Sequence, residues 1–337
     1  MAEEHGLLER ARAGDKGAFG ELVEPHRGEL HAHCYRMLGS VHDAEDALQD
    51  ALLRTWRGLP RFEGRSSLRS WLYKIATNTC LDMLAKRPKR VLPLDYGPPA
   101  DPHNDDLEPL VEPVWVEPYP DEQLGLEGGR AAPDARYELR ESVELAFVAA
   151  LQHLPARQRA VLILRDVLGF SARDVAEALD TSDAAVKSAL QRARKAVDER
   201  LPDRSQQATL RALDDEGIRK VINRYMDAWE RSDFDALVAM LAEDATLAMP
   251  PPPSWYSGRD AIAAFYAIHG PARWRHIPTR ANGQLAVGCY LWDADSGTYA
   301  AHALDVLSMR GTRIAAVSAF VDPQVFQLFG LPDELPR

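Results

Sequence analysis

The sequence predicts a multidomain protein with two all-α domains, an acidic linker between them, and a C-terminal α+β domain. Three observations support this fold class. Apolar residues recur at helical spacing in residues 1–90 and 140–204, acidic residues and prolines concentrate in residues 91–139, and helical and then alternating apolar segments follow in residues 205–337. A chain of 337 residues also suits two or three domains, each with its own core.

Composition narrows the environment in which the chain works. Hydrophobic residues make up 46% of it and charged residues 27%, and no apolar run approaches the roughly 20 residues that a bilayer requires, so we expect no membrane partner. The charged N-terminal stretch has no apolar signal core, which predicts a cytoplasmic protein. Cys34, Cys80 and Cys289 are few and scattered, which predicts buried reduced thiols, with no metal site and no cofactor.

The net charge of −11 is concentrated in one segment. Residues 91–139 hold 12 acidic and 2 basic residues and nine prolines, which predicts an extended linker. Trp115 and Tyr119 stand out in this segment because aromatic side chains are unfavourable in water. They are either scattered aromatics of a tether or part of a peptide that docks on a neighbouring domain.

Residues 155–197 have the pattern of a helix-turn-helix. Ser171 and Asp174 have capping-box spacing, and Ser182 can cap a second helix. That helix has an apolar stripe and an opposite polar face suited to a DNA major groove, although a solvated amphipathic helix pair would show a similar pattern. The residues expected to face DNA are Ser182, Ala184, Lys187, Ser188, Gln191, Arg192 and Lys195.

Residues 42–57 predict an amphipathic helix with an acidic face. Ala44, Leu48, Ala51, Leu52 and Thr55 form its apolar stripe. Such faces are usually only solvated, but this one could also bind a basic partner. The far side carries Asp43, Asp46 and Asp50, with Gln49 and Leu53 beside them.

The next segment mixes basic and aromatic residues in a way that suits phosphate neutralisation and base stacking. The aromatics could equally be core residues, and we expect this for Trp71. The mixture comprises Arg65, Arg69, Lys74, Lys86, Arg87, Lys89 and Arg90 with Phe62, Trp71 and Tyr73.

Two motif blocks together resemble bacterial sigma factors of the sigma-70 family, in the compact extracytoplasmic-function (ECF) type. DAEDALQDALLRTWRGLPRFEG and SLRSWLYKIATNTCLDMLAKRPKR look like region two, and LPARQRAVLILRDVLGFSARDVAEAL with the helix after it looks like region four. The blocks occur in the family's order and cover about half of the chain. The resemblance implies residues 1–90 as region two, 91–139 as the linker and 140–204 as region four.

The resemblance implies two partners, core RNA polymerase and promoter DNA. The acidic face, Asp43, Asp46, Gln49, Asp50 and Leu53, would bind the clamp helices of the largest polymerase subunit. The second helix of region four would read the minus-35 element as duplex. Asn78 and Asp82 match the family's Asn-x-x-x-Asp pattern, so a flipped base would be read near Asn78. The minus-10 contacts would be Ser66, Arg69, Lys74, Asn78, Asp82, Arg87, Lys89 and Arg90.

Residues 205–337 resemble the SnoaL-like branch of the nuclear-transport-factor-2-like fold, a cone of sheet and helices around a pocket. The pattern is a long helix, a short helix, a strand, a third helix and then strands. ECF sigma factors with such a tail form a subgroup apparently controlled by it, which implies that the tail modulates activity here. Asp322 and Pro323 loosely match a C-terminal motif of that subgroup and join Trp115 and Tyr119 as expected interdomain contacts.

The tail could act as an enzyme, bind a small-molecule ligand, or serve a purely autoregulatory purpose, and the last of these is favoured. His302 and Asp305 lie three apart in a strand pattern, so we expect them on opposite faces and not as a catalytic dyad. We therefore expect no catalytic residue and no enzymatic activity. Candidate cavity residues are Tyr225, Trp229, Trp255, Tyr256, His276, His302 and Asp305.

The sequence thus predicts an ECF sigma factor whose C-terminal domain and linker modulate its activity. Two alternatives stay open: a one-component DNA-binding regulator, and a SnoaL-type enzyme or binding protein fused to a DNA-binding module. The acidic face argues against a repressor, which has no use for a polymerase-binding surface.

Overall fold

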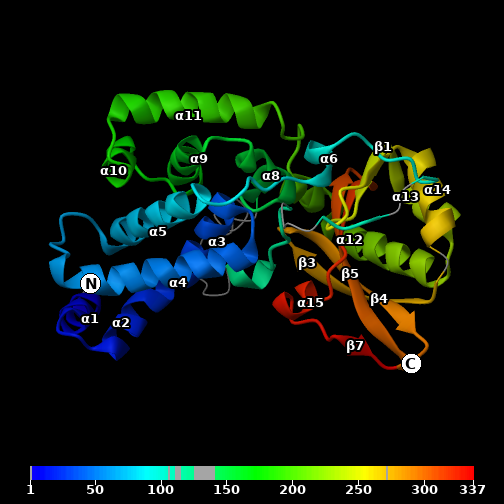
Figure 1. Ribbon diagram of the computed structural model, residues 1–337, viewed down its shortest axis with the longest axis horizontal. Coiled ribbons are helices and arrows are strands. Elements are labelled where there is room, and N and C mark those ends of the chain that lie inside the picture. The colour runs from blue at the N-terminus through cyan, green and yellow to red at the C-terminus, as the bar shows by residue number, and fades with distance from the viewer. Residues whose placement is uncertain (1, 105–106, 111–114, 125–140, 271) are drawn as a thin grey trace. The chain divides into compact units, whose positions relative to one another are not determined.

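The computed structural model describes residues 2–104, 107–110, 115–124, 141–270 and 272–337. The chain forms two compact units (Figure 1). Unit 1 comprises residues 1–89 and 122–201, and unit 2 comprises residues 90–121 and 202–337. The expected acidic linker is therefore divided, because its first part packs with the C-terminal domain.

The N-terminal part of unit 1 is a helical bundle in which α3, α4 and α5 pack on one another. Serine side chains start two of these helices: Ser40 accepts a hydrogen bond from Asp43 N, and Ser67 from Ser70 N, both at 3.0 Å. Tyr35, Met37 and Tyr73 lie in the core. The helices are α1 (Ala2–Arg12), α2 (Lys16–Val23), α3 (Arg27–Leu38), α4 (Val41–Gly58) and α5 (Leu68–Leu84).

The second part of unit 1 contains the expected helix-turn-helix. The capping box of Ser171 and Asp174 is present at the start of α10, and Ser182 caps α11 through Ala185 N at 3.2 Å. Asp180 turns the chain between them with a φ of 47°. The elements are α8 (Leu145–Gln152), α9 (Ala156–Leu162), a π-helical segment (Ile163–Val167), α10 (Ala172–Ala178) and α11 (Asp183–Asp198).

Two buried arginines join the two parts of unit 1. Arg36 is 1% exposed and donates from Nη2 to Ser142 Oγ at 2.7 Å, and Arg159 is 3% exposed and donates to Met37 O. Gln152 Nε2 donates to Arg36 O at 3.2 Å. Burial lowers the pKa of Arg159 to about 10. Because a buried charge is stable only when it is hydrogen-bonded, these contacts hold α3 against the segment from Ser142 to α9.

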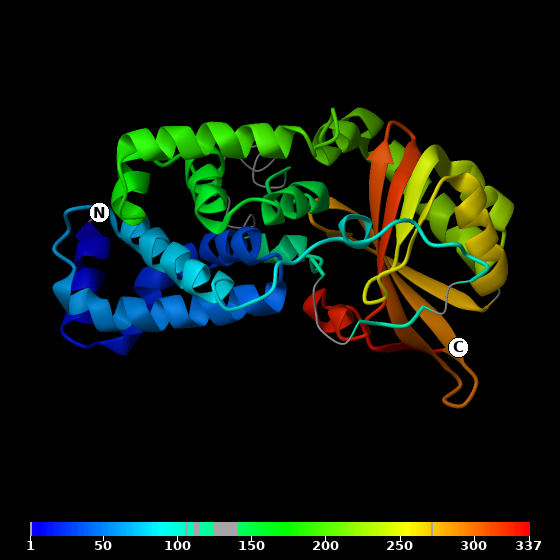
Figure 2. The same cartoon turned by 45° about the horizontal axis from the view of Figure 1, so that its top comes forward.

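Unit 2 is built on a curved mixed sheet with the strand order β2-β1-β6-β5-β4-β3 (Figure 2). β1 and β6 run parallel, and the other neighbouring pairs are antiparallel. This confirms the predicted α+β class. The strands are β1 (Leu241–Ala248), β2 (Trp255–Ser257), β3 (Trp274–Ala281), β4 (Gln284–Asp293), β5 (Thr298–Arg310), β6 (Arg313–Phe320) and β7 (Glu334–Leu335), which pairs with β5.

Helices cover this sheet and close its core. α12 contacts β3, β4 and β5, and α14 contacts β1. α12 is interrupted at Asp214, which has a φ of 57° and whose Oδ1 accepts from Gly217 N at 2.8 Å. The kink at Asp214 divides α12 into two helical parts. The helices are α12 (Gln206–Glu230), α13 (Phe234–Met240), α14 (Arg259–His269) and α15 (Val325–Leu328), with α6 (Pro93–Tyr96) in the linker.

The composition led to expectations about membrane-spanning helices and about the three cysteines. None of the helices among the described residues is long and apolar enough to cross a membrane. Cys34, Cys80 and Cys289 are all buried, which confirms that part of the prediction, and none of the three forms a disulfide.

Candidate functional site

Helix α11 presents a polar face to solvent. Its apolar side is fixed by four buried residues, Val186, Leu190, Ala193 and Val197. Arg192 Nη1 donates to Ser188 Oγ at 2.6 Å, and the hydroxyl of Ser182 is occupied as the helix cap. All seven residues predicted to face DNA are exposed: Ser182, Ala184, Lys187, Ser188, Gln191, Arg192 and Lys195.

Two residues of α5 predicted to contact DNA bind the end of α10 and the turn after it in this structure. Lys74 Nζ donates to Glu177 O at 2.8 Å and lies 3.7 Å from Asp180 Oδ1. Asn78 Nδ2 donates to Ala178 O at 3.3 Å. The polar ends of both side chains are therefore hydrogen-bonded to the carboxyl end of α10.

Arg69 is a half-buried structural residue, in contrast to its predicted role on a DNA-facing surface. Its guanidinium lies over Tyr73 at 4.9 Å and over Phe170 at 5.0 Å, and it is 3.1 Å from a Glu29 oxygen. Trp71, expected in the core, is half-buried and stacks on Phe62 at 4.7 Å. The aromatic residues of this segment thus pack within the protein.

The acidic face of α4 is smaller than the sequence suggested. Asp43 is 8% exposed and forms an ion pair with Arg87, so neither is a free surface charge. The expectation failed because the capped first turn directs Asp43 inward, where Arg87 lies beside it. The remaining residues are exposed and share one side of α4: Asp46, Gln49, Asp50 and Leu53, the last of which is 54% exposed.

The other predicted minus-10 residues are dispersed. Ser66 is exposed before α5, Asp82 pairs with Arg54 at 2.8 Å, and Lys89 Nζ lies 3.0 Å from His153 Nδ1. Arg90 belongs to unit 2, where it donates to Trp115 O at 2.8 Å and its side chain is 11% exposed. Burial in the linker contradicts a DNA-facing position for Arg90 in this form.

The aromatic segment of the linker packs on the C-terminal domain. Trp115 Nε1 donates to Pro251 O at 2.8 Å. The backbone of Tyr119 pairs with Asn282 through two 2.8 Å bonds, one to Asn282 Oδ1 and one from Asn282 N. Trp115 and Tyr119 are buried. Of the two interpretations, a docking peptide describes this geometry.

Asp322 and Pro323 lie elsewhere in unit 2, at the turn between β6 and α15. Val325 N donates to Asp322 O at 3.1 Å and Phe326 N to Pro323 O at 3.2 Å. Gln324 N donates to Asp322 Oδ1 at 2.9 Å. These bonds shape the start of α15 within the C-terminal domain.

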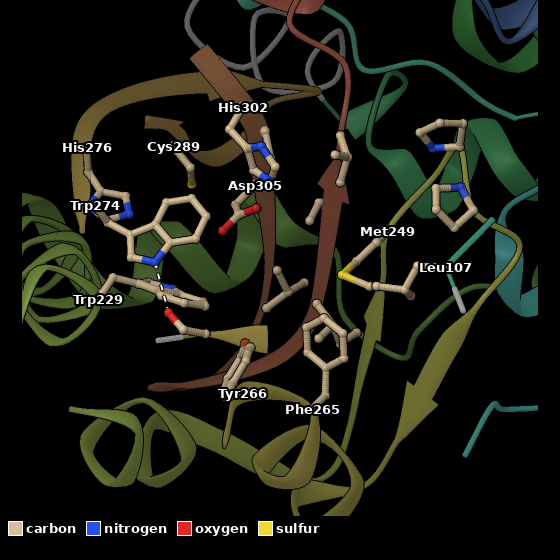
Figure 3. A pocket seen from close by; sticks show the side chains of 18 of the residues that line it. Leu107, Trp229, Met249, Phe265, Tyr266, Trp274, His276, Cys289, His302 and Asp305 are labelled. Atoms are coloured by element: carbon tan, nitrogen blue, oxygen red, sulfur yellow. Dashed lines mark hydrogen bonds between the residues drawn. The ribbon is translucent and has the colours of Figure 1, made fainter. Parts of the chain in front are cut away.

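Unit 2 encloses a cavity of about 320 Å³ (Figure 3). Its walls are mostly apolar and aromatic, and Asp305 lies among them. Trp255 and Tyr256 do not line it. Sequence reasoning missed Leu107 and Pro109, which contribute to the wall from the linker and carry no signal in an acidic, proline-rich segment. Other wall residues that it missed include Met249, Phe265, Tyr266, Trp274 and Cys289.

His302 and Asp305 both line this cavity, so the prediction that they face opposite sides was wrong. The register between β4 and β5 shifts at this point: Cys289 pairs with Ala303, but Tyr290 pairs with Ala301. One extra residue in β5 reverses the alternation of side chains. A bulge of this kind has no signature in the local sequence.

Burial shifts the pKa values of three polar groups in the cavity toward their uncharged forms. Tyr225 Oη donates to Asp305 Oδ2 at 2.7 Å, and burial raises the pKa of Asp305. Burial also lowers the pKa of His276 to about 4 and lowers that of His302. A neutral histidine can both donate a hydrogen bond to a ligand and accept one from it.

The three parts of the chain match known families. Residues 22–90 match Sigma-70 region 2, residues 144–197 match Sigma-70, region 4, and residues 222–317 match the SnoaL-like domain. The ECF RNA polymerase sigma factor SigG of Mycobacterium tuberculosis is 44% identical over 324 residues, covering 95% of this chain and 85% of that protein. The chain belongs to the ECF sigma factors.

This ECF sigma factor also resembles shorter and structurally known relatives. The RNA polymerase sigma-H factor of Pseudomonas aeruginosa is 30% identical over 203 residues, covering 59% of this chain and 94% of that protein. The crystal structure of the M. tuberculosis ECF sigma factor SigJ superimposes with a TM-score of 0.56 at 24% identity, covering 91% of this chain and 97% of that one. The SigJ likeness supports the fold. The protein is thus a transcription initiation factor and not an enzyme.

Proposed function

We propose that the linker and the C-terminal domain modulate the activity of this ECF sigma factor. The observation that carries the proposal is the packing of Trp115 and Tyr119 on unit 2. The linker joins regions two and four in the chain, so a linker held by the C-terminal domain restricts the separation that the two regions can adopt.

We assign the polymerase contact to the exposed side of α4. Asp46, Gln49, Asp50 and Leu53 combine negative charge with one exposed apolar side chain. This combination suits a basic, partly apolar helical partner such as the clamp helices of the largest polymerase subunit.

We assign promoter reading to α11 and to α5 in two different states. The exposed face of α11 is available for a minus-35 major groove as it stands. Lys74 and Asn78 of α5 are engaged by α10, so reading of the minus-10 element requires α10 to leave α5. Binding to polymerase would supply the free energy for this separation, and DNA binding by the isolated chain should be weak.

Transcription by purified core polymerase from a cognate promoter tests this function. The full-length chain, a chain ending near Pro202, and full-length Trp115→Ala are compared, with the exposed linker residue Leu94→Ala as the matched control. We expect the full-length chain to support transcription. The level should change in the chain ending near Pro202 and in Trp115→Ala, and it should stay the same in Leu94→Ala. Inactivity of full-length and truncated chains alike would contradict sigma activity, and equal activity of all forms would contradict modulation. Tight duplex binding without polymerase would favour a one-component regulator.

The cavity of unit 2 extends this proposal to a small-molecule ligand. Its volume of about 320 Å³ lies at the lower end of the range for ligand sites. A ligand there would connect the C-terminal domain to a chemical signal.

A further inference from the structure

The cavity of unit 2 has walls that favour an apolar ligand. Trp229 lines the cavity, with its ring centroid 5.0 Å from that of Tyr266 and 5.6 Å from that of Trp274 in edge-to-face contacts. Phe265 and Met249 continue the apolar surface (Figure 3). Aromatic edges and faces at these spacings provide contact area for a ring or a chain.

Charge in the cavity disfavours an ionic ligand. The side chains that the structure places around it include no lysine or arginine to balance an anion. Asp305 is already hydrogen-bonded to Tyr225, and burial raises its pKa, which disfavours the carboxylate that a cation would need. His276 and His302 also have lowered pKa values because of burial. Glu230 lies 3.5 Å from His276 Nδ1.

Four buried polar atoms of residues that line the cavity have no hydrogen-bond partner among the described residues: Tyr266 Oη, Trp229 Nε1 and both ring nitrogens of His276. Tyr266 is 1% exposed. An indole N–H can only donate, and a phenol can donate or accept, so a ligand oxygen that accepts hydrogen bonds could pair with either atom. Leaving such atoms unpaired is unfavourable, which gives the cavity a preference for a ligand with that oxygen.

The linker supplies part of the same cavity. Leu107 and Pro109 line it beside Pro251 and Pro252, and Leu110 N donates to Pro251 O at 3.4 Å. Leu107 also packs against the core of unit 2. A ligand that contacts Leu107 therefore gains affinity only while the linker is docked, and by linkage it stabilises the docked linker.

We propose that this cavity binds a neutral, mainly apolar small molecule carrying a carbonyl or hydroxyl oxygen, and that the bound molecule strengthens docking of linker residues 107–110. The second half rests on the proposed modulation by the linker. The first half stands on the walls and the unpaired donors alone.

Three probes of matched ring system separate the ligand classes: 2-acetylnaphthalene, 2-naphthoate and 2-naphthylmethylammonium. Titration calorimetry on the full-length protein at neutral pH measures each affinity. We expect the ketone to bind at least tenfold more tightly than the anion and the cation. Binding of either ion as tightly as the ketone, or absence of ketone binding at its solubility limit, would overturn the ligand class.

Variants locate the site and test the linker. Tyr266→Phe and Leu107→Ala should each weaken ketone binding by roughly fivefold, the loss of one hydrogen bond or one apolar contact, while Leu94→Ala should not change it. Ala319→Phe places a ring in the cavity and should abolish ketone binding. Cooperative thermal melting of this variant would show that it is still folded. Unchanged affinity in Tyr266→Phe and Leu107→Ala would overturn the site.

Hydrogen exchange of the backbone amides of residues 107–110 measures the coupling. The ketone should slow exchange there at least threefold, and an equal rate with and without ketone would overturn the coupling. A protein that binds the ketone but transcribes equally with and without its C-terminal domain would contradict the proposed function only. A protein whose transcription depends on that domain but that binds no ketone would contradict the ligand inference only.

Discussion

At the scale of single residues, burial decides which charges remain available for partners. Asp43 and Asp46 lie three residues apart in the same helix and both pair with Arg87, but Asp43 is 8% exposed whereas Asp46 is exposed and lies 3.9 Å from Arg87 Nη2. The first is therefore a structural residue and the second is part of the surface that we assign to polymerase.

Substitution separates these two roles. Asp43→Ala should lower the free energy of unfolding by about 1–2 kcal/mol, because Arg87 loses a charged hydrogen-bond partner. Asp46→Ala should leave stability within about 0.5 kcal/mol and weaken co-purification with core polymerase. Urea unfolding and pull-down on core polymerase measure the two effects. Equal destabilisation by both substitutions would argue against this division.

A buried histidine gives unit 1 a dependence on pH. His33 is fully buried, its Nε2 lies 2.9 Å from Thr77 Oγ1, and burial, with the nearby charge of Arg36, lowers its pKa to about 3. As pH falls below 6.5, His33 is protonated in the unfolded chain but stays neutral in the folded chain. The free energy of unfolding therefore falls by about 1.4 kcal/mol per pH unit.

The variant His33→Asn removes this titration. Its unfolding free energy should change less between pH 7 and pH 5 than that of the natural protein, although burial also lowers the pKa of His31, which leaves a residual slope. Urea unfolding followed by the helical circular dichroism signal at the two pH values measures this. Identical slopes for the two proteins would show that His33 does not titrate as described.

At the scale of elements, local signals were readable in the sequence and long-range register was not. The capping box of Ser171 and the cap of Ser182 follow from side chains three residues apart, and both were predicted. The shared position of His302 and Asp305 depends on how β5 pairs with β4, which no local spacing reports. The sequence around Trp115 does not predict its docking, because its partner, Pro251, lies far along the chain.

The helix-turn-helix offers a test in which stability and DNA binding separate. Ser171→Ala removes the capping box of α10 and should cost about 1 kcal/mol of stability. Gln191→Ala, on the exposed face of α11, should leave stability unchanged and reduce transcription from a promoter with an intact minus-35 element. Thermal melting and transcription by reconstituted holoenzyme measure the pair. A loss of stability in Gln191→Ala would contradict its placement on a free face.

At the scale of the whole molecule, the chain passes between the two units three times, after residues 89, 121 and 201. The family and the fold class were predictable from motif blocks, whereas the division of the linker was not. Composition identified the segment as acidic and rich in proline but could not report that part of it packs against distant strands.

Deleting the C-terminal domain should expose the linker's apolar residues. Trp115, Val116 and Tyr119 are each at most 6% exposed in the full chain and would lose their partners in a chain ending near Pro202. We expect increased binding of a hydrophobic dye and faster proteolysis within residues 90–121. Replacing Trp115 and Tyr119 by serine in the shortened chain should reverse the dye binding. Equal dye binding by the full and shortened chains would contradict the packing described.

The hydrogen bond that Gly283 N donates to Asp121 Oδ1 also imposes an order on biosynthesis. The two residues are 162 positions apart, and a ribosome adding about 5–20 residues per second needs roughly ten to thirty seconds to cover that distance. Regions two and four leave the ribosome within that interval, while the strands that receive the linker are still unmade. Each newly synthesised molecule therefore passes through a brief period in which its promoter-binding half is complete and its linker is unrestrained.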